Sequence, residues 1–149
     1  EYQSLPNKEQ TSLADWLLSQ GVTHVIGSHP HVVQPMELRT DTLTGRQNVV
    51  LYSLGNFISN MSARKTDGGL LFKLELTKDS IGTSVSNCGY SLIWTARPTL
   101  SKKKNYVLYP ASIPTDSLSA EERNRLKIFI NDTRELFRKH NRGINEYIF

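Results

Sequence analysis

Apolar residues recur with helical spacing near the start of the chain and give way to a short apolar run. Leu13, Trp16 and Leu17 fall at positions i, i+3 and i+4, and Gly21 follows them as a helix stop signal. Residues 23–27 then read as a short buried strand. A helix followed by a short turn and an apolar strand is typical of α/β proteins, so the sequence predicts that class.

The middle of the chain alternates between apolar and polar residues, as strands do. Residues 41–45 supply turn residues, so the strands on either side of them are expected to form a hairpin. Residues 59–69 are polar and end in two glycines, which predicts a loop. Trp16 and Trp94 are expected in the core. The predicted strands cover residues 36–40, 49–52, 70–77, 82–97 (as one strand or two) and 106–109.

A long helix is predicted over residues 117–141, near the end of the chain. Ser119 and Glu122 have the spacing of a capping box, and Gly143 lies beyond the stripe as a stop signal. The apolar stripe of this helix consists of Leu126, Phe129, Ile130, Thr133, Leu136 and Phe137.

Composition narrows the picture only a little. The chain has 149 residues, a formal net charge of +4 and no apolar stretch long enough to span a membrane. We predict a single domain over residues 1–149, with a site-bearing segment at about 1–78 and a β-rich segment with the last helix at about 79–149. Lys102, Lys103 and Lys104 form a basic run, which we interpret as a solvated loop rather than a nucleic-acid patch. No nucleic-acid partner is expected.

The stretch most suggestive of chemistry is Gly27-Ser-His-Pro-His-Val-Val-Gln-Pro35. It follows the predicted strand at 23–27, and α/β proteins place their sites at the carboxyl ends of strands. His29 and His31 are one residue apart, and Pro30 biases the backbone toward an extended conformation. In an extended backbone both imidazoles point to one face, as two metal ligands must. Alternatively, they are two surface histidines in a Pro-rich turn.

At this point the chain resembles the CapA-type (PGA_cap) bacterial capsule synthesis proteins, a family within the calcineurin-like metallophosphatase superfamily. The opening Glu1-Tyr2 is similar to the end of the family's His-Trp-Gly-x-Glu-Tyr segment. The resemblance extends to about Phe57 and weakens beyond it. The residues that carry it are Gly27, His29, Pro30, His31, Val32, Gln34 and Pro35, then Tyr52, Ser53, Leu54, Gly55, Asn56 and Phe57.

The resemblance implies a fold and a metal site. The chain would be the C-terminal part of a metallophosphatase-like two-sheet β-sandwich flanked by helices. His29 and His31 would each bind one metal of a dinuclear site of Mn, Fe or Zn, and Ser28 stands where the superfamily has Gly. A catalytic zinc typically takes three protein ligands, so two histidines predict weak metal binding and no hydrolysis by this chain alone. No catalytic residue is assigned.

Two polar residues near the histidines leave alternatives open. Asn56 either contacts substrate or hydrogen-bonds the histidine loop, or it simply shapes the turn after the strand at 49–52. Ser28 is assigned the same pair of roles, substrate binding or loop shaping. Gly55 is expected where the backbone needs a positive φ or a close approach.

The resemblance also implies a setting for the longer protein of which we expect this chain to be a part, the parent protein. One hypothesis is a metal-dependent phosphoesterase-like enzyme of poly-γ-glutamate-type capsule synthesis. The alternative is a non-catalytic scaffold or ligand-binding subunit of a surface-polymer synthesis or export complex. Expected partners are a phosphorylated or anionic polymer precursor, other capsule-synthesis proteins and a second copy of the chain. The expected location is the extracytoplasmic side of the cell envelope, with a membrane anchor preceding this chain.

Overall fold

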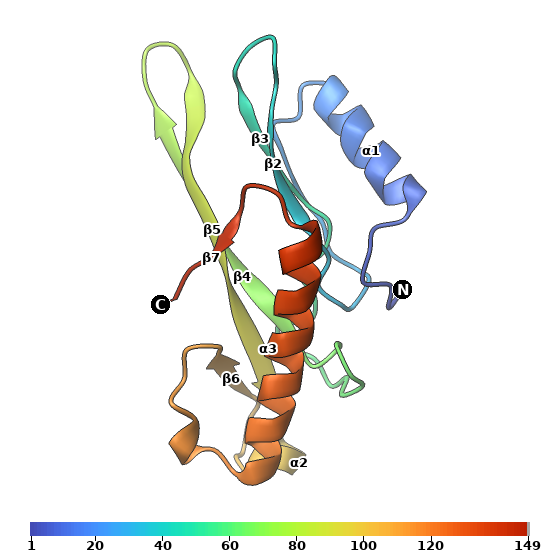
Figure 1. Ribbon diagram of the computed structural model, residues 1–149, viewed down its shortest axis with the longest axis vertical. Helices are drawn as coiled ribbons and strands as arrows, with labels where there is room; N and C mark the ends of the chain where they lie inside the picture. The colour runs from blue at the N-terminus through green and yellow to red at the C-terminus, as the bar shows by residue number, and fades with distance from the viewer. Residues whose placement is uncertain (149) are drawn as a thin grey trace.

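The computed structural model describes residues 1–148, which form two β-sheets and three α-helices (Figure 1). The mixed α/β class predicted from the sequence is confirmed, while the extent of a single domain over residues 1–149 stays a prediction. In chain order the elements are α1 Lys8–Ser19, β1 His24–Ile26, β2 Met36–Thr40, β3 Gln47–Leu51, β4 Gly68–Lys78, β5 Thr83–Ala96, α2 Pro98–Ser101, β6 Val107–Pro110, a 3-10 turn Thr115–Ser117, α3 Ala120–His140 and β7 Asn145–Glu146.

The smaller sheet has the strand order β1-β3-β2 and carries α1 on one face. β1 runs parallel to β3, and β2 and β3 form the predicted antiparallel hairpin. Ala14 and Leu18 of α1 pack against Val50 and Tyr52. Neighbouring residues of a strand point to opposite faces. Val49 and Leu51 of β3 therefore face away from α1, into the main core.

The larger sheet has the order β4-β5-β6, and the short β7 pairs with β5 in parallel. Residues 82–97, for which the sequence allows one strand or two, form a single 14-residue strand, β5. Its hairpin with β4 has a register shift between Glu75 and Leu76. Beyond that shift the hairpin extends away from the rest of the molecule, so the outer end of β4 contributes little to the core (Figure 1).

The helix α3 lies along the larger sheet and closes the core (Figure 1). Its predicted capping box forms, with reciprocal hydrogen bonds between Ser119 and Glu122. Its buried stripe packs with β3 and β5 around Trp94, which is 1% exposed as predicted. Neither α3 nor any other helix within residues 1–148 is long and apolar enough to cross a membrane. The stripe residues that are buried are Leu126, Phe129, Ile130, Thr133 and Phe137.

The prediction that Trp16 is a core residue is wrong. Trp16 is 58% exposed and Leu13 is 56% exposed. The residues of α1 that contact the smaller sheet are instead Ala14 and Leu18, one helical step away from the apolar stripe. Since the helix rotates by about 100° per residue, that step turns the larger apolar side chains toward solvent.

Candidate functional site

The histidine loop begins where β1 ends, at the carboxyl ends of the parallel pair β1 and β3, as predicted. The backbone N–H of Gly27 donates to the Leu51 carbonyl at 2.7 Å, and the Leu54 N–H donates to the Gly27 carbonyl at 3.3 Å. A Cβ atom at position 27 would collide with the Tyr52 carbonyl oxygen. The glycine therefore lets the start of the loop lie directly against the end of β3.

The extended backbone expected at the two histidines does not form. His29 has a φ of 101° and His31 a φ of 63°, both in the left-handed region that non-glycine residues seldom adopt. Pro30 between them is buried, and its carbonyl accepts a hydrogen bond from the Tyr2 N–H at 2.9 Å. The two imidazoles still come together, with ring centroids 6.0 Å apart and ring planes 42° apart. Positive φ values at both His29 and His31 are the kind of strain that surrounding contacts must hold in place.

Asn56 fixes the orientation of the His31 ring. The side-chain Nδ2 of Asn56 donates to the Thr66 carbonyl at 2.9 Å, so its Oδ1 is the atom that faces His31 Nδ1, at 3.1 Å. Because an amide oxygen only accepts, the proton of a neutral His31 ring must be on Nδ1. The lone pair of the other nitrogen, Nε2, is then free to bind a cation. Asn56 thus makes the hydrogen bond to the histidine loop that was one of its expected roles, and its contact with substrate stays a prediction.

The first two residues of the chain lie against the histidines. The Glu1 carboxylate oxygen Oε1 is 3.5 Å from His29 Nε2 and 4.0 Å from His31 Nε2. The Tyr2 ring stacks on His31, with centroids 5.8 Å apart and an angle of 22° between the planes. Glu1 also raises the pKa of the Tyr2 hydroxyl, because the phenolate would lie near a like charge. The Glu1 carboxylate therefore lies beside both imidazoles at the surface.

Gln34 anchors this arrangement, although the sequence assigned it no role beyond its place in the motif. Its side chain is 1% exposed. Its amide nitrogen, Nε2, donates to the carbonyls of Gln3 at 2.9 Å and Leu5 at 3.2 Å, and its Oε1 accepts from Gln10 Nε2 at 2.8 Å. Since a buried amide is costly without partners, these bonds tie the first residues and the start of α1 to the histidine loop. Only the tertiary structure brings these four residues together.

The segment after β3 needs glycine, as expected from the sequence. Gly55 has a φ of +73°, and an added Cβ would lie 2.8 Å from Val33 Cγ1 and 2.9 Å from the Gly68 carbonyl oxygen. Ser53 is fully buried, and its hydroxyl accepts from the Gly55 N–H at 3.2 Å. The close approach at Gly55 carries the next residue, Asn56, to His31.

The loop at residues 57–67 is fastened to α3 by an ion pair. Arg64 donates to both carboxylate oxygens of Asp132, at 2.6 and 2.7 Å. This contact holds the pKa of Asp132 below its ordinary value. The Thr66 carbonyl of the same loop accepts the hydrogen bond from Asn56. By holding this loop on α3, the ion pair indirectly supports the hydrogen bond that orients His31.

The donor set suits a divalent metal in kind but is incomplete. Imidazole nitrogens and a carboxylate are usual ligands of Zn and Mn. Within residues 1–148, however, no group of three His, Cys, Asp or Glu side chains is arranged to hold a metal ion. Of the other candidates, Ser28 is exposed and lines an apolar groove with Ile26 and Phe57. His24 accepts a hydrogen bond from the Val49 N–H at 3.1 Å and so has a structural role.

Comparison with known proteins gives similarity over the same part of the chain. Residues 1–61 match the family described as "Bacterial capsule synthesis protein PGA_cap". The chain is 34% identical over 82 residues to the "PGA biosynthesis protein CapA" of Bacillus subtilis (strain 168), which covers 55% of this chain and 20% of that protein. It is 29% identical over 85 residues to the "Capsule biosynthesis protein CapA" of Bacillus anthracis, covering 57% of this chain and 19% of that protein. The matched segment thus spans about a fifth of each relative. No solved structure matches the chain.

Proposed function

We propose that this chain supplies two histidine ligands to a metal-dependent phosphoesterase-like site of a capsule-synthesis protein. The match of residues 1–61 to the bacterial capsule synthesis family PGA_cap supports this proposal. The site would be completed by parts of the parent protein outside this chain. The fold of the parent domain would be the metallophosphatase-like sandwich that the resemblance implies, with the two sheets seen here as one portion of it.

The observation that carries this proposal is the hydrogen bond between His31 Nδ1 and Asn56 Oδ1. Metal-binding histidines usually donate their second ring N–H to a fixed acceptor, which sets the tautomer and aims the free nitrogen. His29 and Glu1 lie on the side to which His31 Nε2 points. A pair of divalent metals would polarise a phosphoryl oxygen and generate a hydroxide nucleophile. The role of this chain is to hold the two imidazoles in position, with Tyr2 stacked against one of them.

A second candidate is a non-catalytic scaffold or ligand-binding subunit of a surface-polymer complex. It is favoured by one observation, the lack of a three-residue metal-binding group within residues 1–148. The two candidates differ in what the parent protein adds: carboxylate and Asn ligands for an enzyme, and none for a scaffold.

We further propose the partners and the location. A phosphorylated or anionic polymer precursor would suit a chain with a net charge of +4. Exposed apolar side chains, including Trp16 on α1 and Ile26 and Phe57 at the groove, would contact other capsule-synthesis proteins or a second copy of the chain. The parent protein would act on the extracytoplasmic side of the cell envelope and be membrane-anchored.

Turnover of an activated phosphodiester by the parent protein, with manganese or zinc added, tests the enzyme proposal. We expect turnover that EDTA abolishes and that the His29→Ala/His31→Ala variant lacks. His140→Ala is the matched control, because it removes an imidazole at the end of α3 and should keep full activity. Turnover by the isolated 149-residue chain would contradict the proposal that the site is incomplete. A parent protein that neither binds metal nor turns over the phosphodiester would favour the scaffold.

A further inference from the structure

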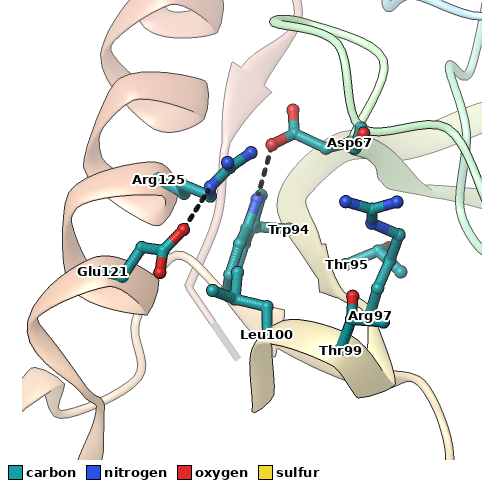
Figure 2. A pocket seen from close by; sticks show the side chains of 9 residues that line it. Asp67, Trp94, Thr95, Arg97, Thr99, Leu100, Glu121 and Arg125 are labelled. Atoms are coloured by element: carbon teal, nitrogen blue, oxygen red, sulfur yellow. Dashed lines mark hydrogen bonds and ion pairs between the residues drawn. The ribbon is translucent and has the colours of Figure 1, made fainter.

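A cavity of about 130 Å³ lies between the end of β5, the short α2 and the start of α3 (Figure 2). Trp94 forms its buried wall. Asp67, the residue that follows Thr66, lies at one side. Neither His29 nor His31 lines it, so it is a separate feature from the candidate metal site. One water molecule needs about 10–15 Å³ of cavity volume of this kind, so the cavity has room for an anionic group and not for a whole polymer.

Two guanidinium groups face this cavity with most of their donors unused. The hydrogen bond that Arg97 makes within residues 1–148 is a long one, 3.5 Å, to the Asn60 carbonyl. Arg125 makes one of 3.4 Å, through Nε, to Glu121. Each guanidinium carries five N–H donors, so both arginines retain open forks. Figure 2 shows the two groups approaching the Asp67 carboxylate from opposite sides of the Trp94 ring.

Asp67 does not neutralise these two charges by direct contact. Its Oδ2 accepts a hydrogen bond from Trp94 Nε1 at 2.9 Å. Arg97 and Arg125 lower the pKa of Asp67 only through space, and burial outweighs them, so that the pKa is raised. Asp67 thus faces the neutral indole N–H of Trp94 and the guanidiniums of Arg97 and Arg125. The Arg125 guanidinium also donates to Glu121.

We propose that this cavity binds a single oxyanion group, a carboxylate or a phosphate, between the guanidinium forks of Arg97 and Arg125. Planar forks of this kind match the oxygen pair of a carboxylate or phosphate and form charge-assisted hydrogen bonds. The Thr99 and Ser62 side chains that line the cavity add hydroxyl donors. The size of the cavity restricts the ligand to a terminal or side-chain anionic group.

The indole of Trp94 provides a direct test. In a ¹H–¹⁵N spectrum of the chain, the Trp94 Nε1–H resonance should shift and saturate on titration with inorganic phosphate or with glutarate, a dicarboxylate. The resonance of the exposed Trp16 should stay in place and serves as an internal control. Saturation by phosphate alone would identify a phosphate site, and saturation by glutarate alone a carboxylate site.

Variants separate the cavity from general charge effects. Arg97→Gln should weaken binding by roughly 10- to 100-fold, as the loss of charge-assisted hydrogen bonds predicts. Arg46→Gln removes one positive charge from the exposed β2–β3 turn and should leave the dissociation constant unchanged. If Arg125→Gln lowers the melting temperature too far to be titrated, Arg97→Gln alone decides. No saturable shift of Trp94 up to tens of millimolar of either anion, or equal weakening by Arg46→Gln, would overturn the proposal.

Discussion

Replacing Asn56 by Ala should release the His31 ring from its single tautomer. The substitution removes the acceptor 3.1 Å from His31 Nδ1 and also the donor to the Thr66 carbonyl. A hydrogen bond of this type contributes about 0.5–1.5 kcal/mol, so the ratio of the two tautomers should change roughly 2- to 12-fold toward the form protonated on Nε2. The buried Thr66 residue is left with an unpaired carbonyl, which should lower the free energy of unfolding by about 1–3 kcal/mol.

Long-range ¹H–¹⁵N spectra of the imidazoles measure this ratio directly. They are best recorded at about pH 8.5, well above the ordinary histidine pKa of about 6.5. Asn60→Ala is the matched control, because Asn60 lies in the same loop and its Oδ1 accepts from the Tyr106 hydroxyl, away from His31. A wild-type His31 protonated on Nε2, or an unchanged tautomer ratio in Asn56→Ala, would refute the role given to Asn56.

Three further predictions concern stability. Gly55→Ala should lower the free energy of unfolding by about 2–4 kcal/mol from strain and steric overlap, whereas Gly45→Ala, with a φ of +68° but open space around it, should lose only about 1 kcal/mol in the same urea titration. Asp132→Asn should lose at most about 1 kcal/mol at neutral pH. Because Arg64 lowers the pKa of Asp132, the wild-type advantage is present above the unfolded value of 3.8 and is lost as the pH falls through the lower folded pKa; a difference that persists in acid would contradict this assignment. Gln34→Leu should cost roughly 2–4 kcal/mol and speed amide exchange in the first residues, and unchanged exchange there would show that Gln34 is not their anchor.

The repeating parts of the fold were predictable because each follows from a local period. The stripe of α3 and the Ser119 cap lie within a few turns of one helix, and the β2–β3 hairpin joins neighbours in sequence. The prediction for Trp16 was wrong because it assumed that the largest apolar side chains of α1 point toward the core. Here the small Ala14 lies against the sheet instead.

The candidate site was only partly predictable, for a different reason. The spacing of His29 and His31 was visible in the sequence, but their left-handed backbone conformation was not, because residue preferences argue against it. The contacts that hold it come from Glu1, Gln34 and Asn56, which lie up to 30 residues away in sequence. No periodic pattern encodes such contacts, so they appear only once the chain is folded. The cavity beside Trp94 is likewise lined by residues that are distant in sequence, from Ser62 to Arg125, and no periodic pattern predicts it.

The metal content of the parent protein tests the central claim most directly. After dialysis against manganese and zinc, elemental analysis should find about two metal ions per chain, the number a dinuclear phosphoesterase site requires. The His29→Ala/His31→Ala variant should lose metal, while His140→Ala should match the unmodified protein. Equal metal content in the double variant, or no bound metal in any of the three proteins, would contradict the assignment of the histidine loop as a metal site.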